Sequence, residues 1–240
     1  MKILIVGVGN IGKRHLESLT KYNKIKQFHI VEKNNLVTSV LKTKYFYKKF
    51  FFHKAIDNLD NKTQFDLAIL STNSDVRFKI FTEIVRRIKV KFFILEKFVF
   101  QNIDHFNYAN KLIRNKNLKV FINCPMRTWP FFKNIKKKYY KSEVEILMTG
   151  SKWGLASNAI HYIDLLNHFK NKKKIYLSKN QEMHIYKSKR KNFVEFGGIL
   201  DAKIDKSNLL KMVDNYKQKS KPKLYIKFNK IFFEIDAGRN

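Results

Sequence analysis

Three glycines near the start of the chain, Gly7, Gly9 and Gly12, have the G-x-G-x-x-G spacing that lets a backbone approach a phosphate group closely. The first glycine of such a set permits a tight turn after a strand. The second removes the side chain that would keep a pyrophosphate away, and the third lets a helix pack against the strand. The unpaired N–H groups at the start of that helix then attract the anion. The spacing therefore predicts a turn that binds the phosphates of a dinucleotide.

The sequence around the glycines contains the elements that this chemistry needs. Residues 3–6 are an apolar run that ends at Gly7, which predicts a buried strand. Ile11, Leu16 and Leu19 then recur at helical intervals. A strand, a glycine turn and a helix in this order are the context that the motif requires.

A second apolar run, residues 28–31, ends at Glu32, about 20 residues after Gly12. An acidic residue at this position hydrogen-bonds the adenosine ribose, and its charge favours NAD because it repels the 2′-phosphate of NADP. Lys33 and Asn34 offset part of that repulsion, so NADP stays open as the alternative. The competing interpretation is a glycine-rich turn followed by a surface glutamate.

Composition indicates a folded protein. The chain has 240 residues, of which 44% are hydrophobic and 15% aromatic, and this excludes a disordered protein. No apolar run approaches the roughly 20 residues that a membrane-spanning helix needs, and no secretory signal is expected. Cys124 is the single cysteine, so no internal disulfide and no cysteine-based metal site are predicted. The cytoplasm is the expected location, and no metal is expected.

The formal net charge of +31 raises the alternative of a nucleic-acid-binding or membrane-binding protein. The excess consists mostly of lysine, is spread over nearly every segment, and accompanies many Asn, Ile, Phe and Tyr residues. These residue types share A/T-rich codons, so compositional drift explains them together. A dedicated phosphate-binding surface would concentrate charge and favour arginine. The densest runs, residues 136–138 and 172–174, are therefore expected to be solvated surface, with no dedicated nucleic-acid or membrane partner.

The first half of the chain alternates between predicted strands and helices. Beyond the elements above, helices are predicted at 36–41, 75–88 and 104–115, and strands at 45–52, 66–70, 92–95 and 118–122. Alternation of this kind predicts right-handed β-α-β units and a parallel sheet. Residues 1–122 are therefore predicted to form a Rossmann-type, doubly wound α/β domain that binds a dinucleotide.

The pattern changes in the second half. Helices are predicted at 128–140 and 158–169, and strands at 144–148, 181–186, 193–202, 223–228 and 231–235. A run of strands with few crossovers predicts a mainly antiparallel sheet. Residues 123–240 are thus predicted to be a smaller α+β domain for substrate binding and oligomerisation.

From residue 1 to about 170 the chain resembles the Gfo/Idh/MocA oxidoreductases, the family of glucose–fructose oxidoreductase and inositol dehydrogenase. Several motifs carry the resemblance in order: GVGNIGKRH at 7–15, DLAILSTN at 66–73, LEK at 95–97, NCPMRTWP at 123–130, GSKWG at 150–154 and NAIHYID at 158–164. The first motif alone is generic, whereas the ordered set is specific.

The resemblance implies hydride transfer between a nicotinamide cofactor and a hydroxyl carbon, usually of a sugar or cyclitol. It implies that Lys97 lies at the substrate and that His161 exchanges the hydroxyl proton. Together with the glycine turn it predicts a set of cofactor-binding residues: Gly7, Val8, Gly9, Asn10, Ile11, Gly12, Glu32, Ser71, Thr72, Asn73, Glu96 and Lys97. The predicted substrate-binding residues are Arg127, Trp153, Asn158 and His161. The competing interpretations are an exposed lysine after a strand and a histidine on a half-buried helix.

Three departures from the family pattern favour a non-catalytic dinucleotide-binding protein as the alternative. Phe98 stands where the family has a proline, which removes a backbone constraint. Ser157 stands where an acidic residue usually precedes the histidine by one helical turn. The second domain is also short for the family. Residues 153–161 most resemble members that act on sugars of surface polysaccharides, which implies a sugar or sugar-nucleotide substrate, and the family's open second sheet implies a homo-oligomer.

Overall fold

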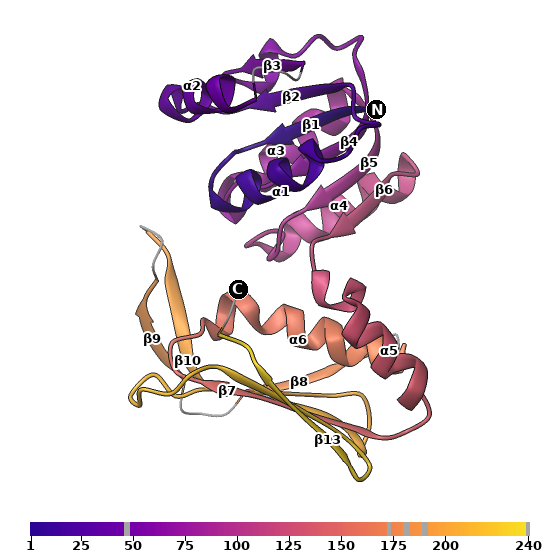
Figure 1. The fold of residues 1–240 in the computed structure, drawn as a ribbon, viewed down its shortest axis with the longest axis vertical. Helices are drawn as coiled ribbons and strands as arrows, with labels where there is room; N and C mark the ends of the chain where they lie inside the picture. The colour runs from indigo at the N-terminus through magenta and orange to yellow at the C-terminus, as the bar shows by residue number, and fades with distance from the viewer. Residues whose placement is uncertain (46–48, 172–173, 180–182, 189–191, 239–240) are drawn as a thin grey trace. The chain divides into compact units, whose positions relative to one another are not determined.

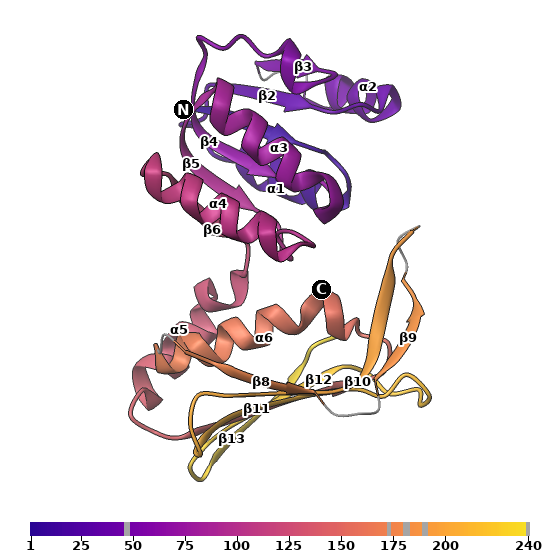
Figure 2. The same ribbon diagram turned by 180° about the vertical axis from the view of Figure 1, so that it is seen from behind.

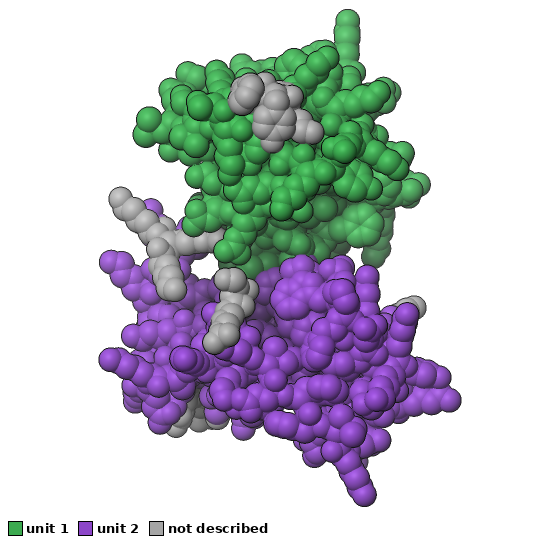
Figure 3. All heavy atoms as spheres, in the orientation of Figure 1, with its two compact units in different colours: residues 1–123 green, residues 124–240 purple. Residues whose placement is uncertain are grey.

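The computed structural model describes residues 1–45, 49–171, 174–179, 183–188 and 192–238, in two compact units, Met1–Asn123 and Cys124–Asn240 (Figures 1 and 3). Each unit has its own hydrophobic core. The strands predicted at 45–52 and 181–186 and the lysine run at 172–174 each lie partly outside the described residues.

The first unit is built around a parallel sheet. Its strands are β1 (Lys2–Val6), β2 (Gln27–Val31), β3 (Phe50–His53), β4 (Gln64–Leu70), β5 (Lys89–Leu95) and β6 (Lys119–Ile122). Its helices are α1 (Asn10–Thr20), α2 (Asn35–Lys44), α3 (Ser74–Arg87), α4 (Ile103–Asn115) and the short 3₁₀ helix η1 (Ile56–Asn58). The strand order β3-β2-β1-β4-β5-β6, with parallel neighbours throughout, confirms the predicted doubly wound α/β fold.

Both faces of this sheet are covered, which is why its strands are nearly continuous apolar runs. In β1, Ile3 and Ile5 belong to the core under α1 and α2, whereas Leu4 and Val6 belong to the core under α3 and α4. Figures 1 and 2 show one pair of helices on each face. The strand order reverses between β1 and β4, and ligands of open α/β sheets bind at the carboxyl ends of the strands at such a point.

The second unit combines a mainly antiparallel sheet with α-helices and a short 3₁₀ helix. Its helices are η2 (Pro125–Thr128), α5 (Pro130–Tyr139) and α6 (Leu155–Lys170). Its strands are β7 (Val144–Gly150), β8 (Tyr176–Lys179), β9 (His184–Lys187), β10 (Val194–Lys203), β11 (Asn208–Asp214), β12 (Lys223–Phe228) and β13 (Ile231–Asp236). The order is β13-β12-β7-β11-β10-β8, with β9 paired to β10. The β7–β11 pair is parallel and the other pairs are antiparallel.

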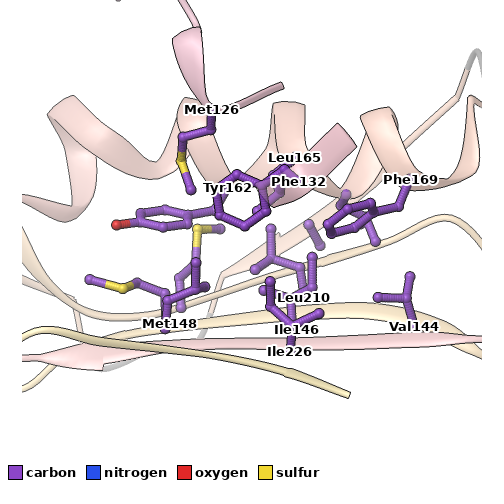
Figure 4. Packing of buried hydrophobic residues seen from close by; sticks show 14 of the residues in the cluster. Met126, Phe132, Val144, Ile146, Met148, Tyr162, Leu165, Phe169, Leu210 and Ile226 are labelled. Atoms are coloured by element: carbon purple, nitrogen blue, oxygen red, sulfur yellow. The ribbon is translucent and has the colours of Figure 1, made fainter. Parts of the chain in front are cut away.

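The core of the second unit lies between α6 and one face of this sheet. Figure 4 shows Phe132, Tyr162 and Phe169 from the helices above Ile146 and other strand residues. Alternation along β7 places Val144, Ile146 and Met148 in the core and leaves Glu145 exposed, because successive strand residues point to opposite faces. No described helix of this unit covers the face of the sheet away from α6.

Several predicted boundaries were wrong. The helix predicted at 128–140 begins later, at Pro130, because η2 ends at Thr128 and Pro130 occupies the first position of α5, where its missing N–H costs nothing. Of the strand predicted at 45–52, the described part is strand β3 from Phe50, and Tyr45 is instead the C-cap of α2. Strands β8 and β11 were not predicted.

Candidate functional site

The glycine turn joins β1 to α1 at the reversal point of the parallel sheet. Gly7 has φ +82°, a backbone conformation that favours glycine, and its N–H donates to Val31 O at 2.9 Å. A Cβ on Gly7 would lie 2.8 Å from Cγ2 of Thr72, so the loop after β4 also excludes a side chain there. The turn itself leaves no room for a side chain at Gly12, because a Cβ there would lie 2.2 Å from Gly7 O. Both glycines are therefore required by the protein's own packing.

Gly9 differs from the other two glycines. A Cβ on Gly9 would have no heavy atom of the described residues within 4 Å, and the φ of −69° is open to any residue. The chain's own packing thus gives no reason for a glycine here. Gly9 is the N-cap of α1, so its missing side chain leaves open the approach to the first N–H groups of the helix, at Asn10 and Ile11. The residues present at this helix end fit a pyrophosphate.

Glu32 follows β2 and contacts the glycine turn. Its Oε2 accepts the N–H of Val8 at 2.7 Å, and its Oε1 accepts the N–H of Asn34 at 2.9 Å. These two bonds hold the carboxylate at the carboxyl edge of the sheet. A carboxylate has about four acceptor positions, so Glu32 can also accept hydrogen bonds from the hydroxyls of a ribose.

The loop after β4 supports the turn from the opposite side. The N–H of Ser71 donates to Val6 O at 3.0 Å, and its Oγ donates to Gly7 O at 2.7 Å. Asn73 is exposed and is the N-cap of α3. Ser71 and Thr72 therefore contact the glycine turn directly, whereas the side chain of Asn73 is exposed at the start of α3.

Glu96 follows β5, and its buried carboxylate is bonded within the first unit. Oε1 lies 2.6 Å from His15 Nε2 of α1 and accepts from Asn123 Nδ2, which follows β6, at 2.7 Å. Burial alone would raise the pKa of Glu96, but these hydrogen bonds and the charge of Arg77 outweigh it and lower the pKa. The next residue, Lys97, is half-buried at the carboxyl end of β5. Glu96 thus links α1, β5 and β6 beneath the predicted cofactor site.

Arg77 is a residue of this region that sequence reasoning missed. It lies in the first turn of α3, is 2% exposed, and donates to backbone carbonyls of the loops after β4 and β5. One sequence signal could have identified it. Arg77 has helical spacing to Phe81, Ile84 and Val85, so it occupies the buried face of an otherwise apolar helix.

In the second unit, the predicted residues Trp153 and Asn158 hold the start of α6. Asn158 Nδ2 donates to Trp153 O at 2.7 Å, and Trp153 Nε1 donates to Val213 O at 2.9 Å. The Trp153 ring also packs edge-on against Tyr162 at a centroid distance of 5.5 Å. His161 is half-buried on the same helix.

The predicted substrate residue Arg127 is ion-paired with Asp164 of α6. Its Nε donates to Asp164 Oδ2 at 2.7 Å and its Nη2 donates to Oδ1, which is the bidentate geometry of strong arginine pairs. The hydrogen bonds that Arg127 donates to Asp164 raise the pKa of Arg127. Asp164 lies three residues after His161, so the pair stands one helical turn from the histidine.

Two carboxylates near the start of α6 were also missed. Glu195 of β10 accepts the N–H of Ser157 at 3.3 Å. An acidic group therefore does contact this turn of α6, although it comes from a strand and not from the helix itself. Asp214 of β11, 1% exposed, accepts the N–H groups of Lys152 at 2.6 Å and Gly154 at 3.2 Å. Their partners are 38 and about 60 residues away in sequence, which is why no local pattern indicated them.

Among the described residues, no group of three or more His, Cys, Asp or Glu side chains is placed to hold a metal ion. Nor does any helix in this part of the chain have the length and hydropathy needed to cross a membrane.

Comparisons with known proteins identify the fold. No family model matches the chain, and no curated protein matches it in sequence. Solved structures do match. A Gfo/Idh/MocA family oxidoreductase of Vibrio cholerae has a TM-score of 0.70 at 13% identity, over 99% of this chain and 76% of its own. A dehydrogenase of Clostridium difficile has a TM-score of 0.70 at 16% identity, over 100% and 81%.

A third structure shows what such a protein binds. The scyllo-inositol dehydrogenase of Lactobacillus casei, solved with NAD(H) and scyllo-inositol, has a TM-score of 0.71 at 15% identity, over 99% of this chain and 76% of its own. At these identities the likeness concerns the fold. Both units are included in it, because nearly the whole chain is covered. The chain therefore has the two-domain fold of the Gfo/Idh/MocA oxidoreductases.

Proposed function

We propose that this protein is an NAD(P)-dependent oxidoreductase that transfers a hydride between nicotinamide and a hydroxyl carbon of a sugar or sugar-nucleotide. The observation that carries the proposal is Gly9, a glycine that the chain's own packing does not require, at the helix end where a pyrophosphate would bind. The solved structures of the same fold support it, since they include a dehydrogenase with bound NAD(H) and a cyclitol.

NAD is the proposed cofactor. Gly7 and Gly12 shape the turn, Gly9 admits the pyrophosphate, and Val8, Asn10 and Ile11 supply backbone to it. The Glu32 carboxylate is held by Val8 and Asn34 where it meets the ribose hydroxyls, and its charge repels a 2′-phosphate. Exposed Lys33 beside it keeps NADP as the alternative.

The proposed chemistry assigns a role to each side chain. When bound, the nicotinamide accepts or donates the hydride. Lys97 holds the hydroxyl oxygen and stabilises the negative charge that develops on it, and His161 takes or returns the hydroxyl proton, because imidazole titrates near neutral pH. Trp153 and Asn158 shape the substrate end of α6. Arg127 orders this region through Asp164 and binds the substrate's polar groups at its exposed edge.

The substrate class rests on the resemblance of residues 153–161 to family members that act on surface-polysaccharide sugars. A non-catalytic dinucleotide-binding protein is the second candidate. Phe98 in place of a proline and Ser157 in place of an acid favour it. We assign residues 1–122 to dinucleotide binding and 123–240 to substrate binding and oligomerisation.

A homo-oligomer is proposed through the face of the second sheet away from α6. A groove of about 630 Å³ lies on it, with Leu147, Tyr225 and Phe232 among its lining residues. Lys227 pairs with Glu145 across this face at 3.1 Å, so it carries both signs of charge in a strongly basic chain. A mixed surface of this kind can pair with a second copy of itself. We place the protein in the cytoplasm on its cysteine content, and no metal, membrane or nucleic acid is part of the proposal.

The test separates binding from turnover. Calorimetry with NADH and NADPH measures the cofactor preference. Glu32→Gln should reduce the ratio of NADH affinity to NADPH affinity, because it removes the charge that repels the 2′-phosphate. Single-turnover absorbance of NADH is then followed with inositols, UDP-sugars and CMP-sugars. NADH binding with turnover of any of these supports the enzyme. Binding without turnover supports the non-catalytic candidate, and absence of NADH binding contradicts both.

A further inference from the structure

The side chain of Arg77 is fully buried within the first unit, although it is charged. It is 2% exposed and leaves the first turn of α3 on the helix's apolar face. Burying a guanidinium costs free energy unless its N–H groups are hydrogen-bonded, so a buried arginine needs acceptors that are built for it.

The acceptors of Arg77 are backbone carbonyls from two loops at the carboxyl edge of the sheet. Nη1 donates to Glu96 O at 2.8 Å, to Phe98 O at 2.6 Å and to Val99 O at 3.0 Å, and Nη2 donates to Thr72 O. A planar guanidinium with five donors can bridge two loops in this way, whereas a single ammonium offers three donors at one point.

These contacts surround Lys97 in the chain. Nη1 of Arg77 contacts the carbonyl of Glu96, which precedes Lys97, and the carbonyls of Phe98 and Val99, which follow it. The Glu96 side chain is also held, by His15 and Asn123. No proline restrains residues 96–99, so the hydrogen bonds to Arg77 supply the restraint on this loop.

We propose that Arg77 is a positioning residue, which fixes the Glu96–Val99 backbone and thereby sets where the Lys97 ammonium stands. The role that this placement serves rests on the function proposed above, whereas the placement itself does not. The charge of Arg77 also acts on this segment, because it adds to the hydrogen bonds of His15 and Asn123 in lowering the pKa of Glu96. Arg77 thus orders the loop through its donors.

The test compares Arg77→Met, which removes the donors and keeps the bulk, with Arg77→Lys, which keeps the charge. Arg86→Met is the matched control, since Arg86 is an exposed arginine of the same helix. Hydrogen exchange of the amides of residues 97–100 and the rate of amine labelling at Lys97 are measured by mass spectrometry in the folded proteins. NADH affinity and, where a substrate is turned over, kcat and KM are measured alongside.

In Arg77→Met, exchange at 97–100 should rise about tenfold or more above any rise in β1 and β4, and the Lys97 labelling rate should change. The kcat should fall about 10²-fold while NADH affinity changes little, because a misplacement of about 1 Å suffices for such a loss. Arg77→Lys should be intermediate, and Arg86→Met should match the wild type. Should Arg77→Met not fold, Arg77→Lys carries the test.

Unchanged labelling and exchange in both Arg77 variants would overturn the proposal. So would a rise in exchange spread evenly over the first unit, because that is the signature of lost stability alone. If the wild type binds NADH but turns over no substrate, the proposed function fails, and the exchange and labelling measurements still decide the role of Arg77.

Discussion

Alanine at Gly12 should destabilise the first unit, whereas alanine at Gly9, three residues earlier in the same motif, should leave the protein folded and weaken NADH binding. At Gly12 the new Cβ would lie 2.2 Å from Gly7 O and 2.9 Å from Ser71 Oγ, while ordinary contacts begin at 3.4 Å. Helix α1 would have to move by about 1.2 Å. It cannot do so freely, because its Leu16 is fully buried in the core.

The size of the Gly12→Ala effect follows from two opposing terms. Overpacking against a backbone atom costs about 1–3 kcal/mol, and replacing glycine within a helix returns up to about 1 kcal/mol. Because the 2.2 Å contact is with backbone, the overpacking cost lies in the upper part of its range, at about 2–3 kcal/mol, and after the return of about 1 kcal/mol the free energy of unfolding should fall by about 1–2 kcal/mol. Urea unfolding followed by far-ultraviolet circular dichroism measures it. Tryptophan fluorescence does not suit, because Trp129 and Trp153 both lie in the second unit.

Gly9→Ala is the matched control for folding and the test for binding. Its Cβ meets no described atom within 4 Å, so the expected loss of stability is only that of alanine at an N-cap, about 1 kcal/mol or less. The methyl group would stand where the pyrophosphate approaches, so NADH affinity should fall about tenfold or more, or about 1.4 kcal/mol. Gly9→Val should abolish binding in a folded protein. Calorimetry that finds wild-type affinity in both Gly9 variants would refute the phosphate-turn assignment, and a fully stable Gly12→Ala would refute the packing argument.

Three further predictions concern chemistry, pH and charge. Lys97→Ala and His161→Ala should each lower single-turnover rates by about 10²–10⁴ with little change in NADH affinity, and the double variant should lose less than the product of the two losses; a fully active Lys97→Ala would contradict the catalytic assignment. Burial and the nearby ring of His53 lower the pKa of His29 to about 4. As the pH falls, the unfolded chain therefore takes up a proton at this histidine before the folded chain does. The free energy of unfolding should fall by about 1–2 kcal/mol between about pH 6.5 and about pH 4, a figure reduced to allow for the partial exposure of the ring. Urea titrations at both pH values check this, and His29→Phe should remove part of the dependence. DNA binding should be weak, indifferent to sequence and steeply reduced by salt in anisotropy titrations, and nanomolar sequence-selective binding would contradict the assignment of the charge to composition.

Much of the first unit could be predicted because its signals are local. Buried parallel strands are short apolar runs, their helices carry apolar residues at helical intervals, and the glycine turn joins the two within a few residues. The glycine spacing was sufficient to predict the turn, although it could not distinguish the glycines. Gly7 and Gly12 are required by contacts with Thr72 and within the turn, and Gly9 is not.

The second unit could be predicted less well, because strand pairing there joins distant segments. β11 was missed since its ends, Asn208 and Asp214, are polar residues that look like loop in the sequence. In the fold both are buried and bonded. Asn208 Oδ1 accepts the N–H of Val144 at 3.2 Å, and Asp214 accepts the N–H of Lys152. A buried polar residue is stable only with its partner, and the partner is not visible in a local pattern.

The sequence by itself thus determined the doubly wound first unit, the mainly antiparallel second one and the glycine turn, because hydrophobic periodicity and glycine spacing act over a few residues. Only the tertiary structure showed that Arg77 binds the backbone around Lys97, where Phe98 replaces the family's proline. It also showed that Glu195 contacts the turn of α6 in which Ser157 replaces the family's acidic residue. The physical reason is that a hydrogen bond requires two groups to meet within about 3 Å, and the chain brings these groups together only by folding.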